Sequence, residues 1–113
     1  MNNEEEIKSI VTKCCIKAIL ALNDFARKQI GIKDVKKALT ECAQELDEIF
    51  YKNYQLLTQN PNYTEYLSVI LQISSLARNI ELLGSQYGYD FLRDELFSLI
   101  ESYKRLKKHE SEV

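Results

Sequence analysis

The chain has 113 residues, a length that suits one domain and is too short for two. Hydrophobic residues make up 45% and charged residues 28%, so the chain can bury a core, and a formal charge of −2 excludes the strongly cationic character of dedicated nucleic-acid wrappers. Three Gly and one Pro are too few for the many tight turns of a sheet protein, which argues against an all-β architecture. We expect one helical domain over residues 1–113.

The first predicted helix covers residues 4–30, with Asn3 and Glu6 as a capping pair and Gly31 as the stop. The second begins at about Asp34 and ends before Pro61. In both, apolar residues recur at spacings of three and four, which is typical of one helical face. The predicted inward residues are Ile7, Val11, Cys14, Ala18, Ala21, Leu22 and Phe25, then Val35, Leu39, Cys42, Leu46, Ile49 and Phe50.

The third predicted helix begins at Asn62 and ends at Gly88, and the fourth follows Asp90 as its cap. Their inward residues are Tyr66, Ile70, Ile73, Ala77, Ile80, Gly84 and Tyr87, then Leu92, Leu96, Leu99, Tyr103 and Leu106. The linkers are short, which favours antiparallel neighbours. The pattern predicts an all-α fold, an antiparallel up-and-down four-helix bundle.

Three cysteines, Cys14, Cys15 and Cys42, form no CxxC pair, and their odd number argues against a disulfide framework. We interpret them as small buried apolar residues in a protein of a reducing compartment. The acidic start of the chain lacks the positive charge of an export signal, and no apolar run reaches the roughly 20 residues of a membrane span. We expect a cytoplasmic protein.

Catalytic constellations are not evident in the sequence. The single histidine, His109, lies in a polar tail, no glycine-rich phosphate loop is present, and one histidine cannot supply the paired Glu-x-x-His motifs of a di-iron bundle. We therefore expect no enzyme activity, cofactor, metal or small-molecule substrate.

The outer side of the third predicted helix carries an unusual surface. Ser68, Leu71, Ser75 and Leu82 lie there with Arg78 as the only charge, although a solvated helix face normally collects Lys and Glu. We expect a protein partner, or a second copy, to cover this face. The alternative is that this helix is simply the most central one. Ile16 and Leu20 on the first helix are a second candidate contact, or else ordinary isolated aliphatic residues.

A basic segment spans the first turn and consists of Arg27, Lys28, Lys33, Lys36 and Lys37. Antiparallel geometry would bring it near Tyr87, Tyr89 and Arg93 at the other turn on the same end. Cations beside aromatic rings can hold a phosphate backbone with a stacked base, so we keep nucleic acid as an alternative partner. The simpler interpretation is a solvated turn that complements the helix dipole.

The leading hypothesis is a non-enzymatic interaction or scaffolding module that self-associates or joins a larger assembly. In its architecture, and loosely in residues 91–106, the chain resembles the small helical subunits of type III CRISPR effector complexes, without a diagnostic motif. That resemblance implies neighbour contacts in a filament and contacts with backbone phosphates. The chain is also similar in length and expected fold to class IIa bacteriocin immunity proteins, which are more basic.

Overall fold

The computed structural model describes residues 3–112, and within this range the chain is helical apart from its connecting turns. The elements are α1 (Asn3–Ala26), α2 (Ile32–Lys52), α3 (Tyr54–Gln59), the 3-10 helix η1 (Pro61–Tyr63), α4 (Thr64–Tyr87) and α5 (Phe91–Glu112). The all-α prediction is confirmed. The predicted number of helices is wrong, because the second predicted helix is divided into α2 and the short α3.

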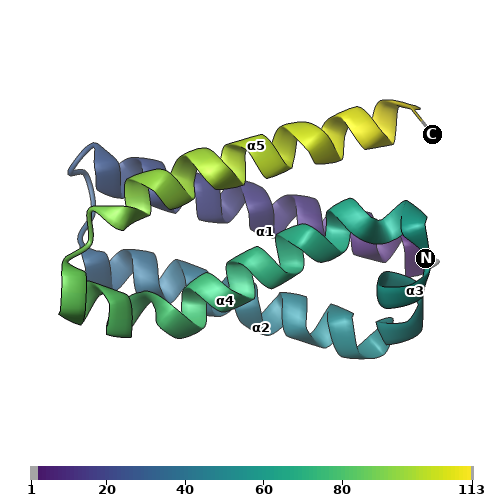
Figure 1. Cartoon of the computed structure of the whole chain (residues 1–113), viewed down its shortest axis with the longest axis horizontal. Helices are drawn as coiled ribbons and strands as arrows, with labels where there is room; N and C mark the ends of the chain where they lie inside the picture. The colour runs from purple at the N-terminus through teal and green to yellow at the C-terminus, as the bar shows by residue number, and fades with distance from the viewer. Residues whose placement is uncertain (1–2, 113) are drawn as a thin grey trace.

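The four long helices run side by side along the longest axis of the molecule, as Figure 1 shows. Helix α1 packs on α2 and α5, and α4 packs on the same two helices. Helices α1 and α4 also contact each other, so their inner sides meet in the core and their outer sides face away from each other. The turns at 27–31 and 88–90 lie together at one end, and α3 lies at the other (Figure 1).

The core consists of the apolar stripes that the sequence predicts, with few exceptions. The predicted inward leucines, isoleucines and valines are all buried, and Cys15, Leu57 and Val69 join them. Two buried serines are satisfied by hydrogen bonds, one from Ser74 to Asp47 of α2 and one from Ser102 to Gln72 of α4. The assignment of Tyr87 to the inner stripe is wrong, because its side chain is 77% exposed on the last turn of α4.

Helix α2 ends at Asn53, where the sequence predicts continuation to residue 60. The Asn53 side chain donates a hydrogen bond to the Ile49 carbonyl at 3.1 Å, and its own backbone leaves the helical region at φ −125° and ψ 34°. Asparagine side chains compete in this way with the helical backbone. The chain then begins α3 in a new direction, which buries Leu57 almost completely.

The turn between α1 and α2 uses its residues differently from the prediction. Gly31 does not end α1 but is the N-cap of α2, where the Asp34 carboxylate accepts a hydrogen bond from the Gly31 N–H at 3.3 Å. Helix α1 ends at Ala26, and Lys28 adopts the left-handed conformation with φ 61°. The Lys28 and Gln29 amides donate to the carbonyls of Phe25 and Asp24, the pattern of a Schellman motif. Lys28 therefore occupies the position that glycine usually takes.

Replacing Lys28 by glycine should stabilise the protein. A glycine adopts the left-handed backbone without the strain of a β-carbon, which stabilises the folded state by about 1–2 kcal/mol. Glycine also has more conformational freedom in the unfolded chain, and this offsets about 0.4–1 kcal/mol of the gain. We expect Lys28→Gly to raise the free energy of unfolding in urea by roughly 0.5–1 kcal/mol. The matched control, Lys28→Ala, keeps the β-carbon and should give no such gain. A glycine variant no more stable than the parent would contradict the assignment.

The three cysteine thiols are buried and free, as the sequence predicts for small core residues. Cys14 and Cys42 meet between α1 and α2, and each thiol lies near the other residue's carbonyl oxygen, at 3.9 and 3.6 Å. The Cys42 sulfur and burial raise the pKa of the Cys14 thiol, and burial raises the pKa of Cys15 to about 12. The hydrogen bond from the Cys14 thiol lowers the pKa of Cys42, so burial, which keeps reagents away, is the protection that all three thiols share.

Alkylation tests this burial directly. We expect iodoacetamide to modify Cys14, Cys15 and Cys42 orders of magnitude more slowly in the folded protein than in urea, because modification requires opening of the core. Intact-mass spectrometry measures the rate. Labelling of the folded protein at the rate of the unfolded chain would show that the helix packing is wrong.

Candidate functional site

The outer side of α4 forms a regular stripe that no other part of residues 3–112 covers. We call the following residues the outer stripe: Ser68, Leu71, Ser75, Arg78, Leu82 and Ser85. All are exposed, with Leu71 at 49% and Leu82 at 59%. Helix α4 contacts every other long helix, and its buried residues lie on its inner side. Within residues 3–112 the central position of α4 leaves this face uncovered, and its contact with a partner stays a prediction.

The spacing of the outer stripe is that of a coiled-coil seam. Its residues alternate steps of three and four, an average of 3.5, which keeps a straight stripe in contact with a partner helix. The stripe carries leucines at equal distances from the midpoint between residues 76 and 77, and serines at both ends. It therefore has nearly the same side chains in both directions.

A groove beside the outer stripe contains a carboxylate with no compensating charge. Gln72, Ser75, Asn79 and Leu83 of α4 line this groove together with Glu95 and Ser98 of α5. Burial, and secondarily the neighbouring Asp94 carboxylate, raise the pKa of Glu95 above its ordinary value. Neither Glu95 nor the stripe residue Arg78 forms an ion pair within residues 3–112. Glu95 and Arg78 thus have no ion-pair partner among the described residues and can pair with groups of another molecule.

The second predicted contact lies on another side of the molecule. Ile16 and Leu20 are exposed on α1, at 39% and 55%. Because α1 and α4 meet through their inner sides, these residues point away from the outer stripe of α4. The structure does not combine the two sets into one interface, and the contact at Ile16 and Leu20 stays a prediction.

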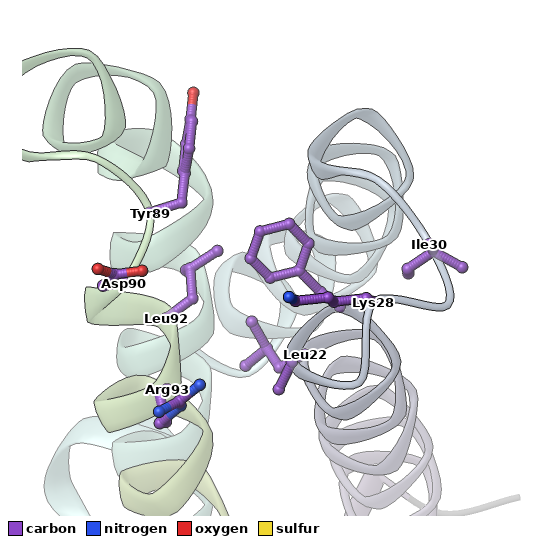
Figure 2. A pocket seen from close by; sticks show the side chains of 9 residues that line it. Leu22, Lys28, Ile30, Tyr89, Asp90, Leu92 and Arg93 are labelled. Atoms are coloured by element: carbon purple, nitrogen blue, oxygen red, sulfur yellow. The ribbon is translucent and has the colours of Figure 1, made fainter.

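A pocket of about 300 Å³ opens at the turn end of the molecule, between the α1–α2 turn and the α4–α5 turn. We call it the end pocket. Figure 2 shows Leu22, Lys28 and Ile30 on one side, and Tyr89, Asp90, Leu92 and Arg93 on the other. Phe25 and Ala26 complete the lining. The Lys28 ammonium and the Arg93 guanidinium extend from opposite sides toward the gap (Figure 2).

The Tyr89 wall of the end pocket depends on a glycine inside α4. A β-carbon at Gly84 would lie only 1.9 Å from a ring carbon of Tyr89, so only glycine lets the ring rest against the helix. The Lys36 ammonium lies 5.7 Å from the centre of the same ring and pairs with Glu81 at 3.8 Å. Tyr89 is therefore held on two sides.

The predicted basic segment is only partly gathered at this pocket. Lys28 lines it and Lys36 lies over its Tyr89 wall, whereas Arg27, Lys33 and Lys37 are exposed outside the lining. The predicted approach of Tyr89 and Arg93 to this turn is confirmed for Lys28. Tyr87 does not belong to the lining. Nucleic-acid contact by the segment stays a prediction.

His109 lies at the far end of the molecule from the end pocket. Its ring meets the Tyr66 ring edge-on at 6.4 Å, and Tyr66 donates a hydrogen bond to Glu110. Within residues 3–112 no three His, Cys, Asp or Glu side chains are grouped to hold a metal ion. Every helix of that range is too short or too polar to cross a lipid bilayer.

Sequence reasoning missed parts of both surfaces. The end pocket joins Leu22, Phe25 and Ile30, which the pattern assigns to the core or to a helix end. The isolated Gly84 was the available signal, because a glycine within a helix disfavours that helix by about 1 kcal/mol unless close packing requires it. No motif or spacing in the sequence indicated a functional role for Glu95.

The chain matches no known family model, no curated protein and no solved structure. The resemblances to type III CRISPR small subunits and to bacteriocin immunity proteins therefore stay predictions.

Proposed function

We propose that the protein is a non-enzymatic, self-associating helical module. In this proposal the four long helices form an antiparallel up-and-down bundle, and the outer stripe of α4 is the contact between two copies. The observation that carries the proposal is the stripe itself, an exposed seam with leucines and coiled-coil spacing on a helix whose other side is buried.

The near symmetry of the stripe favours a second copy over an unrelated partner. A two-fold dimer brings the same patch of both subunits together, so the patch must be complementary to itself. Two α4 helices laid antiparallel about the stripe's midpoint place Leu71 of one copy opposite Leu82 of the other. The same register places Ser75 opposite Arg78, and the terminal serines opposite each other.

Charge complementarity supports the same register. Ser75 lines the groove that contains Glu95, so the Arg78 of a second copy placed opposite Ser75 reaches this carboxylate. The two-fold axis repeats the pair on the other side. Each copy thus supplies the Arg78 cation to its partner and offers its own partly desolvated Glu95 carboxylate in return. Paired charges of this kind fix the register of an interface.

Magnitudes indicate a weak dimer. Each exposed leucine has about half its surface left to bury, worth about 1 kcal/mol, and four leucines therefore offset only part of the roughly 4–15 kcal/mol that association costs. The two ion pairs and the serine contacts must supply the rest. A contact of one helix from each copy falls at the small end of protein interfaces, which is typical of concentration-dependent association.

Sedimentation velocity from about 10 µM to about 1 mM should show a monomer–dimer equilibrium. Leu71→Lys places an uncompensated charge in the seam, and we expect it to abolish the dimer without loss of stability, because this side chain is exposed in the monomer. Leu20→Lys is the matched control on α1 and should dimerise like the parent. A parent that is monomeric at every concentration, or equal loss in both variants, would overturn the proposal.

A charge exchange tests the register. We expect Arg78→Glu and Glu95→Arg each to weaken the dimer at least tenfold, because each sets two like charges against each other. The double variant restores opposite charges across the interface and should recover most of the affinity. If the double variant dimerises no better than the single ones, Arg78 and Glu95 do not meet, and this register is refuted.

A further inference from the structure

The end pocket lies apart from the outer stripe, and it contains two local departures from helix preference. Lys28 holds a left-handed backbone that glycine would adopt more easily, and its side chain lines the pocket. Gly84 occupies a helix interior, and its missing β-carbon makes room for the Tyr89 wall. In a chain whose local preferences otherwise agree with its fold, such departures concentrate at functional sites.

The walls of the end pocket suit a flat ring. Phe25 and Tyr89 present aromatic surfaces, and Leu22 and Leu92 supply an apolar floor. Lys36 fixes the Tyr89 ring from outside by a cation–π contact, which leaves the ring's position defined before any ligand arrives. A volume of about 300 Å³ lies at the lower end of small-molecule sites, so one ring system with one substituent fits, and a longer strand does not.

The rim of the end pocket suits an anion. Lys28 and Arg93 form no ion pair within the described chain, and both extend toward the gap (Figure 2). Asp90 also lines the pocket, and among residues 3–112 its carboxylate accepts no hydrogen bond as the predicted cap of α5, so it can accept one from a ligand. Two cations against one carboxylate give a net positive rim. A phosphate monoester, with a charge of about −1.5 to −2, matches two such cations.

We propose that the end pocket binds a nucleoside 5′-phosphate. The base lies against the rings of Phe25 and Tyr89, and the phosphate accepts hydrogen bonds from Lys28 and Arg93. Asp90 accepts a hydrogen bond from a ribose hydroxyl or a base amino group. This chemistry has two sources, a free mononucleotide and the 5′-phosphorylated end of an RNA strand.

Calorimetric titration of the full chain with adenosine, guanosine, cytidine and uridine 5′-monophosphates tests this site. We expect at least one to bind at least tenfold more tightly than its own nucleoside and than inorganic phosphate, with an affinity that falls as salt is added. The proposal is overturned if none binds, or if inorganic phosphate binds as well as every nucleotide, because the rings then contribute nothing.

Three variants locate the ligand. Arg93→Gln removes one cation and should weaken nucleotide binding at least tenfold. Gly84→Ala changes no lining residue and favours the helix, but it displaces the Tyr89 ring, so nucleotide affinity should fall toward that of inorganic phosphate. Lys33→Gln, outside the lining, is the matched control and should bind like the parent. Equal loss in Lys33→Gln and Arg93→Gln would refute the pocket in favour of diffuse surface charge.

A pair of short RNA strands of identical sequence, one with a 5′-phosphate and one with a 5′-hydroxyl, distinguishes the two sources. Tighter binding of the phosphorylated strand than of the mononucleotide assigns the site to RNA ends. Binding of the mononucleotide without gain from the strand assigns it to a free nucleotide. Equal binding of both strands, unaffected by Arg93→Gln, would contradict the proposal.

Discussion

The burial of one side of α4 is the constraint on which the rest of the account depends. Helices α1, α2 and α5 enclose the inner stripe of α4, from Tyr66 to Gly84, and this packing fixes how the helix is rotated about its axis. With the rotation fixed, the opposite stripe must face outward. Leu71 and Leu82 are therefore exposed as a consequence of the core and not by their own preference.

The rotation of α4 about its axis also determines which residues meet at the end of the molecule that carries the turns 27–31 and 88–90. Gly84 is buried on the inner side of α4, where Tyr89 returns after the turn and lies against it. The ring then faces the end of α1, at which Lys28 closes the Schellman motif. The outer stripe, where we propose a dimer contact, and the end pocket, where we propose a nucleotide site, are separate surfaces, and either proposal stands without the other.

Much of the fold was predictable because it follows from the helical spacing of apolar residues along the chain. Residues such as Val11, Leu39, Ile73 and Leu99 recur at helical spacing, and burial of one stripe on each long helix leaves little freedom in how they pack. The exposed outer face of α4 was predictable for the same reason. The short linkers also predicted that the turn after α1 lies near Tyr89 and Arg93, which the structure shows for Lys28.

The features that the hydrophobic pattern did not predict depend on local hydrogen bonds and backbone conformations at helix ends. The spacing of apolar residues carries no information about these. Asn53 ends α2 through its own side-chain hydrogen bond, within a stretch whose apolar pattern continues. Gly31 begins a helix instead of ending one, because Asp34 accepts its amide hydrogen bond while Lys28 tolerates the left-handed backbone. Tyr87 is exposed because it falls on the last turn of α4.

Distances between two copies test the central claim most directly. The native cysteines are buried, so a spin label can be attached at Ser68→Cys or Ser75→Cys alone, and pulsed electron resonance then measures label separation in the dimer. At a rise of 1.5 Å per residue and a helix spacing of 8–10 Å, the antiparallel register places the backbones about 27 Å apart at residue 68 and about 10 Å apart at residue 75. A long distance at the first position and a short one at the second would support the account. No distance between copies, or equally short distances at both positions, would contradict it.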